Sequence, residues 1–118
     1  MGENVIVIVD LGHDDCELIR KDVESLGVRA EVCEYEADAD YLNSLGEIKG
    51  IIFDGGSGKM VNGFRAEPSE SFYDLKVPVY SVDHASREGV DLYKWPENED
   101  DRRWHIRNFM TTQCGMKL

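Results

Sequence analysis

The sequence predicts a three-layer α/β domain built on a mostly parallel, five-stranded sheet. Continuously apolar, β-branched runs such as Val5–Val9 are typical of strands that are buried on both faces of a parallel sheet. Segments with helical periodicity alternate with these strands, which favours right-handed crossovers and a doubly wound sheet. With 118 residues, the chain is expected to form one domain, residues 1–118.

The first half of the chain predicts a strand, a helix, a second strand and a second helix. After Val5–Val9, apolar residues recur at helical spacing up to Gly27, which suits a helix C-cap: Cys16, Ile19, Val23 and Leu26. Arg29–Tyr35 alternates as a strand, with Ala30, Val32 and Cys33 expected to point inward. A short helix containing Tyr41, Leu42 and Leu45 then ends at Gly46.

The second half predicts three further strands, at Gly50–Phe53, Val77–Val82 and Val90–Trp95. A loop rich in Gly and polar residues (54–68) and a short helix (69–75) separate the first two of these strands. In the last helix Asn98 is the expected cap, Gly115 closes the helix, and one face holds Ile106, Phe109, Met110 and Gln113.

The predicted strand order is the flavodoxin-like 2-1-3-4-5. Only Asp83–Gly89 joins the fourth strand to the fifth, and this segment is short for a parallel crossover. The direction of the fifth strand is therefore left open: it follows an irregular turn in parallel, or it runs antiparallel at the edge.

Composition excludes several classes of partner. Asp and Glu total 24 against 13 Lys and Arg, and the net charge of −11 disfavours nucleic acid and anionic membrane surfaces. No apolar stretch reaches membrane-spanning length, and Met1–Asn4 lacks a leader pattern. Three cysteines without CxxC spacing fit free thiols in a reducing cytoplasm, so we expect no metal site and no cofactor.

Several segments match the motifs of one enzyme family in order and spacing. Val5–Gly12 and Glu17–Val28 are similar to its first strand and helix, and Ile48–Gly56 to its Lys-Gly-Ile-Ile-x-Ser-Gly-Gly-Pro segment. Asn108-Phe109 and Cys114-Gly115 are similar to its closing Asn-Phe-Leu and Cys-Gly. The chain thus resembles class I glutamine amidotransferases, most closely the glutaminase domain of GMP synthetase. The match is gapped, which implies an abbreviated form of that fold.

The resemblance also implies that the family's chemistry is lost. In the family a Val-Pro-Val strand leads into a Gly-x-Cys-x-Gly elbow with the nucleophilic cysteine, and a His-Pro-Glu segment supplies the base and its orienting carboxylate. In this chain Asp83 stands at the nucleophile position, between Ser81 and Ala85, and Trp95 stands at the base position. Glu97 keeps the orienting carboxylate without a histidine to orient. Because losing the nucleophile or the base of a triad costs roughly 10⁶ in turnover, we expect no glutaminase activity.

Polar residues nevertheless remain where a ligand would bind in this fold. The candidate ligand-binding residues are Asp54, Gly55, Gly56, Lys59, Asp83 and His84. The Gly-rich loop can form a backbone nest for an anion beside Lys59, although a plain surface loop is the slightly favoured interpretation. Its spacing is not that of a P-loop. His13-Asp14-Asp15 suits a helix cap better than a metal site.

Two enzymatic alternatives stay open. Asp10 and Asp54, with Ser81 and Lys94, resemble the site of a phosphoacceptor receiver domain, but Asp83–Gly89 leaves no room for the receiver's fourth helix. A residual amidotransferase or hydrolase would use Asp83 and His84, although adjacent residues on a turn point in different directions.

The favoured interpretation is a non-catalytic binding or regulatory subunit. An abbreviated fold should leave aromatic residues in need of a partner, namely Tyr93, Trp95 and Trp104. The expected partner is a second copy of the chain or a synthetase-type protein.

Overall fold

The structure is a computed structural model, and it describes residues 4–10, 16–54, 60–61, 64–65, 70–82, 92–93 and 99–116. Among these residues, one sheet has the strand order β2-β1-β3-β6-β7 and parallel pairing throughout. Its strands are β1 (Asn4–Asp10), β2 (Arg29–Glu34), β3 (Glu47–Asp54), β6 (Val79–Val82) and β7 (Leu92–Tyr93). This topology confirms the predicted fold class and the predicted flavodoxin-like order.

The fifth strand of this sheet, β7, settles the direction that the sequence left open. Ser81 pairs with Leu92 and Val82 with Tyr93 in parallel register. The sheet therefore continues in one direction to this edge, despite the short segment that joins β6 to β7.

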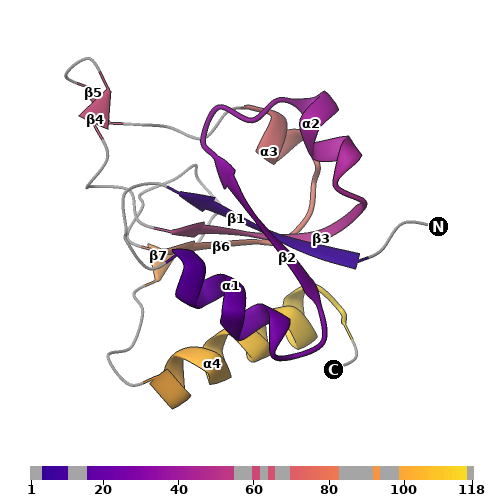
Figure 1. Cartoon of the computed structure of the whole chain (residues 1–118), viewed down its shortest axis with the longest axis vertical. Coiled ribbons are helices and arrows are strands. Elements are labelled where there is room, and N and C mark those ends of the chain that lie inside the picture. The colour runs from indigo at the N-terminus through magenta and orange to yellow at the C-terminus, as the bar shows by residue number, and fades with distance from the viewer. Residues whose placement is uncertain are drawn as a thin grey trace.

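Helices cover both faces of the sheet, so the domain has three layers (Figure 1). Helices α1 (Cys16–Glu24) and α4 (Glu99–Asn108) pack on one face. Helices α2 (Ala39–Ser44) and α3 (Glu70–Asp74) pack on the other. Gly27 follows α1 with φ of 84°, and its N–H donates to the Glu24 carbonyl at 3.0 Å, as the predicted C-cap requires.

Strand β1 divides its side chains between two cores. Ile6 and Ile8 pack with residues of α1 and α4, whereas Val5, Val7 and Val9 pack with residues of α2 and α3. In β2, Ala30 and Cys33 are buried as predicted, and they lie in different cores because successive residues of a strand face opposite ways. Val32 is only half-buried, because β2 is an edge strand.

A close approach of backbone and side chain fixes the end of the chain against β3. The register of β1 and β3 shifts after Val5, which pairs with Ile48, whereas Ile6 pairs with Gly50. A Cβ atom on Gly50 would lie 2.5 Å from the Sγ of Cys114 and 3.2 Å from Phe109 Cζ. Two of the segments that resemble the amidotransferase family, Lys-Gly-Ile-Ile and Cys-Gly, are therefore in contact in the structure.

The last helix changes its geometry before it ends. After α4, Phe109–Gln113 forms a π-helical segment, in which the Cys114 N–H donates to the Phe109 carbonyl at 3.1 Å. The hydroxyls of Thr111 and Thr112 donate to the carbonyls of Arg107 and Asn108, which an α-helix would offer to backbone N–H groups. Ile106, Phe109 and Met110 are buried as predicted. The placement of Gln113 on that face was wrong, because the wider turn leaves it exposed.

A buried ion pair joins α1 to α4. The carboxylate of Asp22 accepts from Arg102 Nε at 2.6 Å and from Arg103 Nε at 3.0 Å. Asp22 is buried and the Arg102 side chain is only 12% exposed. Tertiary packing thus covers the charge of Arg102 at the start of α4.

The predicted loop 54–68 contains two short strands. Strands β4 (Met60–Val61) and β5 (Phe64–Arg65) pair antiparallel as a separate two-stranded sheet.

None of the helices in the described part of the chain is long and apolar enough to cross a membrane.

We predict that Gly50→Ala lowers the free energy of unfolding by about 1–3 kcal/mol, the usual cost of overpacking a core. The cause is the clash of the new methyl group with Cys114 and Phe109. Urea denaturation followed by circular dichroism measures the change.

The matched control is the same substitution in a Cys114→Ala background. There the nearest obstructing atom is gone, so the cost of Ala at position 50 should be smaller. Equal costs in both backgrounds would show that the contact between residues 50 and 114 is not responsible.

Candidate functional site

The carboxyl edge of the sheet is the part of this fold where ligands bind. Parallel register brings three acidic residues into one row there: Glu34 ends β2, Asp10 ends β1 and Asp54 ends β3. Asp54 is also in register with Val82, the last residue of β6, which Asp83 follows in the sequence. The edge is therefore strongly acidic across three adjacent strands.

Asp54 is the candidate ligand-binding residue that the structure describes. It stands where the resembling family has Ser, and it is completely buried, with an exposed fraction of 0%. The Sγ of Cys16 donates a hydrogen bond to Asp54 Oδ2 at 3.3 Å. Its carboxylate thus faces inward beneath the edge, and its role in binding a ligand stays a prediction.

Cys16 is the thiol that the structure brings to this edge, although its sequence position is far from the predicted elbow. It is the first residue of α1, and a helix N-terminus favours a thiolate. Burial and the carboxylate of Asp54 at hydrogen-bond distance both oppose a thiolate. This geometry makes Cys16 a donor to Asp54 rather than an exposed nucleophile.

The other two thiols lie on β2 and after the π-helical segment at the end of the described chain. Cys33 is buried in β2, where burial raises its pKa to about 11 against the opposing effect of a hydrogen bond with Tyr41. Cys114 packs beside Gly50, and burial raises its pKa to about 12. Both thiols are therefore protonated at neutral pH, which is the wrong state for nucleophilic attack.

The remaining predicted site residues lie outside the described residues. These are the ligand candidates Gly55, Gly56, Lys59, Asp83 and His84, and the degenerate catalytic positions Asp83, Trp95 and Glu97. The structure therefore brings Asp10, Cys16 and Asp54 together and leaves the roles of the others as predictions. For the receiver alternative, the burial of Asp54 does not favour phosphorylation, because its carboxylate is not presented to a phosphate donor.

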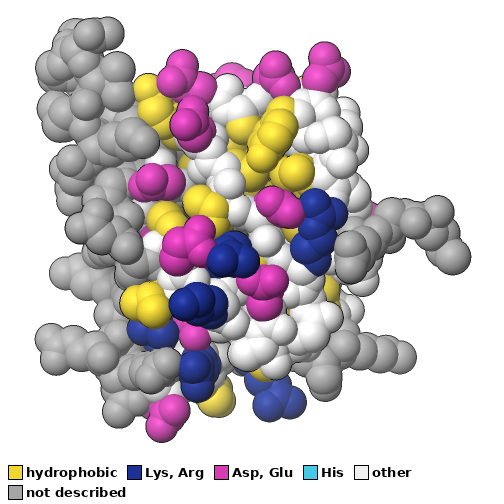
Figure 2. Space-filling model, in the orientation of Figure 1, with side chains coloured by type: hydrophobic (Ala, Val, Ile, Leu, Met, Phe, Trp, Pro, Cys, Tyr) yellow, Lys and Arg dark blue, Asp and Glu magenta, His cyan; other side chains and the backbone are white. Residues whose placement is uncertain are grey.

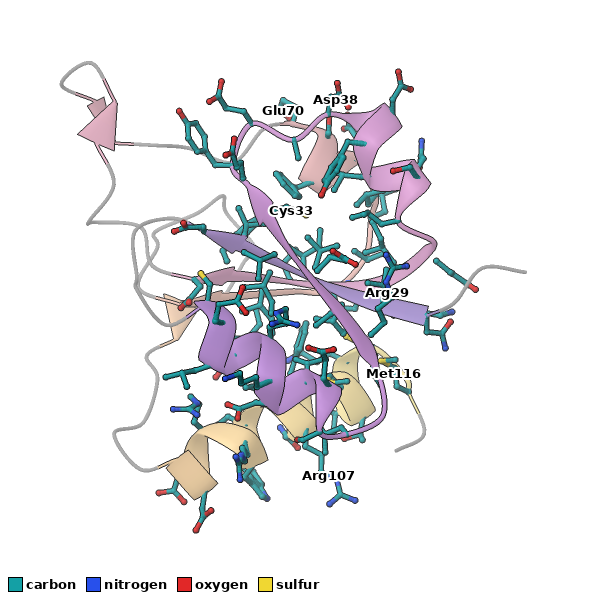
Figure 3. The ribbon with its side chains drawn as sticks, in the orientation of Figure 1. Arg29, Cys33, Asp38, Glu70, Arg107 and Met116 are labelled. Carbon is teal, nitrogen blue, oxygen red and sulfur yellow. The ribbon has the colours of Figure 1, made fainter. Side chains whose placement is uncertain are left out.

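Two grooves lie beside β2. One, of about 420 Å³, is at the amino end of the sheet and is lined by Arg29, Lys49, Cys114 and their neighbours. The other, of about 450 Å³, lies between β2 and α2 and is lined by Glu34, Glu36, Asp38 and Tyr41. Figure 3 labels two of its lining residues, Cys33 and Asp38. Within the described ranges, no group of three or more His, Cys, Asp or Glu residues is placed to hold a metal ion.

Comparison with known proteins identifies relatives of one kind. No protein-family model matches the chain. A putative glutamine-hydrolysing GMP synthase of Bacteroides thetaiotaomicron is 23% identical over 133 residues, covering 98% of this chain and 31% of that protein. The GMP synthases of Blochmanniella floridana and Trichormus variabilis are each 31% identical, covering 65% and 70% of this chain.

These relatives are much longer than this chain. The chain spans 31% of the Bacteroides thetaiotaomicron protein, and 14% and 15% of the other two proteins. Together with the parallel sheet and its strand order, the similarities confirm the resemblance that the motifs indicated. The chain is a glutamine amidotransferase-like domain related to the GMP synthases.

Proposed function

We propose that this domain is non-catalytic and works by binding, as a regulatory or structural subunit related to the glutaminase part of GMP synthases. The observation that carries the proposal is the presence of Asp83 at the nucleophile position and Trp95 at the base position. A carboxylate that attacked an amide would form an unstable anhydride, and no base is evident that would resolve it.

The electrostatics of the described edge support this proposal. Amide hydrolysis develops negative charge on the substrate oxygen, and enzymes stabilise that charge with donors such as backbone N–H groups. Here Glu34, Asp10 and Asp54 end three neighbouring strands. Carboxylates near a developing oxyanion raise its energy, so this edge is poorly suited to the family's reaction.

The proposed partner is a synthetase-type protein or a second copy of this chain. The relatives are GMP synthases, so a synthetase-type protein is a fitting counterpart for this domain. We place the protein in the cytoplasm, because Cys16, Cys33 and Cys114 are free thiols.

Purified protein should release no ammonia from glutamine above background, and Asp83→Cys should not restore activity. The new thiol would lack a base, because Trp95 supplies none, and Ser81 and Ala85 would still replace the elbow glycines. A coupled glutamate dehydrogenase assay measures the ammonia. Turnover that Asp83→Ala abolishes would instead establish the residual hydrolase, and turnover in Asp83→Cys would show a preserved site.

A glutamine-analogue electrophile should leave the three cysteines of the folded chain unmodified at pH 8. Cys16 and Cys33 are buried, and the raised pKa values of Cys33 and Cys114 keep both of these thiols protonated. Peptide mass spectrometry reads the labelling, and urea-unfolded protein treated with iodoacetamide is the control. Rapid modification of any one thiol in the folded chain would contradict the absence of a nucleophile.

The synthetase version of the proposal predicts a stable complex with a GMP synthase-type synthetase from the same genome. Isothermal titration calorimetry at tens of micromolar, the range of modest protein interfaces, should give saturable binding. A glutaminase-active domain added as competitor should reduce the binding if the two domains share a surface. No heat of binding with any such synthetase would leave self-association as the remaining version.

A further inference from the structure

Helix α4 has one face in the core and another that is exposed. Ile106, Phe109 and Met110 face the sheet, and Arg102 is paired with Asp22 of α1. The opposite face carries exposed residues at i, i+3, i+4 and i+7 spacing: Asp100, Asp101, Trp104, Arg107 and Asn108. Arg107 projects from this face at the lower end of the molecule (Figure 3).

Trp104 is the centre of this exposed face, which we call the α4 face. Its side chain is 60% exposed, compared with 49% for Leu18 and 44% for Tyr41. Its ring meets the ring of His105 edge to face, with centroids 5.1 Å apart. A shallow groove of about 180 Å³ lies beside it, lined by Trp104, Arg107, Asn108 and Thr111. Trp and Arg dominate the energetic centres of protein interfaces.

The charges on the α4 face are arranged symmetrically about Trp104. Asp101 lies three residues before it and Arg107 three residues after it, and Asp100 and Asn108 lie four residues to either side. No ion pair of the Arg107 side chain occurs within the described part of the chain. A second α4 laid antiparallel across Trp104 would therefore place carboxylate opposite guanidinium at both ends.

We infer that the α4 face is a homodimer surface, on which two copies pack their α4 helices antiparallel about a two-fold axis at Trp104. Each Asp101 then lies opposite Arg107 of the second copy, and each Asp100 lies opposite its Asn108. The contact is isologous, since the same patch serves both copies, as in most homodimers. Antiparallel helices also place opposite ends of their dipoles side by side.

Local complementarity has to overcome the net charge of −11 on each copy. At physiological ionic strength the Debye length is about 8 Å, so repulsion between distant charges is screened while contacting pairs persist. Acidic side chains also gather at the opposite end of the molecule, around α2, whereas most of the visible Lys and Arg side chains lie over α1 and α4 (Figure 2). On this side of the molecule, the end that holds α4 thus carries more positive charge than the end that holds α2.

The size of the contact sets the expected affinity. The ten residues of α4 span about 15 Å, and one helix-to-helix contact falls short of the standard interface of roughly 1,600 Å². We therefore expect a dissociation constant of about 10–100 µM rather than an obligate dimer. This inference deepens the self-association version of the proposed function, and its failure would leave the glutaminase result untouched.

Sedimentation equilibrium from about 5 to 500 µM at 0.15 M salt tests the dimer, a range set by the expected weak affinity. The native chain should show reversible monomer–dimer exchange, and Trp104→Ala should weaken association at least about tenfold, as expected for a central aromatic residue. Tyr41→Ala is the matched control, because Tyr41 is an exposed aromatic residue on α2, across the sheet. It should associate as the native chain does.

Charge reversal tests the antiparallel geometry. Asp101→Arg and Arg107→Asp should each weaken self-association about tenfold or more, because both contacts of the pair become repulsive. An equimolar mixture of these two variants should dimerise again, since each mixed dimer contains one native and one reversed pair. The double variant should also recover, and Asp40→Arg on α2 controls for the change in net charge.

Each outcome decides the inference. A native chain that stays monomeric at 500 µM overturns it, as does a dimer that Trp104→Ala leaves unchanged. Failure of the two mixed variants to associate would overturn the two-fold antiparallel arrangement. Circular dichroism establishes that each variant is folded. If a charge-reversal variant fails to fold, the native chain and Trp104→Ala still decide whether the α4 face forms the dimer. Binding of an acidic protein at this face without self-association would assign it to a different partner.

Discussion

The structure depends first on the burial of β1 from both sides. Every side chain from Val5 to Val9 is completely buried, and alternate residues contribute to different cores. A strand of this kind is stable only when helices cover both faces of its sheet, because each face would otherwise expose apolar side chains to water. The order of the layers and the central place of β1 follow from this constraint. The carboxyl edge then begins where the apolar runs of β1 and β3 end, at Asp10 and Asp54.

Two long-range contacts hold α4 in place against this sheet. At one end, Asp22 of α1 binds Arg102 in a partly closed environment, where breaking a pair usually costs more than forming it contributes. At the other end, the side chains of Cys114 and Phe109 pack against the backbone of Gly50, in the space that a Cβ atom would need. Both contacts use the inward face of the helix. The outward face, with Trp104 and Arg107, is therefore held rigidly in position, which lowers the entropy that a partner would lose on docking.

The fold and the chemistry of this family are separable for a physical reason. Sheet burial, helix packing and the Gly50 contact hold the described part of the domain together, and the residues that make these described contacts are not those predicted at the nucleophile and base positions. A catalytic site, in contrast, needs several groups positioned within a fraction of an ångström. Under the proposed function, Asp83 and Trp95 would remove the reaction while these described contacts remain. The acidic row of Glu34, Asp10 and Asp54 would then be tolerated, because no anionic transition state would have to form beside it.

The sequence by itself determined the strand order and the helix positions. Apolar periodicity, helix-ending glycines and motif order are local signals, and each can be recognised in the sequence without knowledge of distant contacts. Only the tertiary structure decided that Cys16 donates to Asp54, 38 residues away, and that Arg102 is paired with Asp22. The parallel direction of β7 and the π-helical turn that exposes Gln113 were likewise fixed by packing and hydrogen bonding. The symmetric charges around Trp104 are visible in the sequence, but their exposure is not, because the exposed face of a helix depends on what its other face meets.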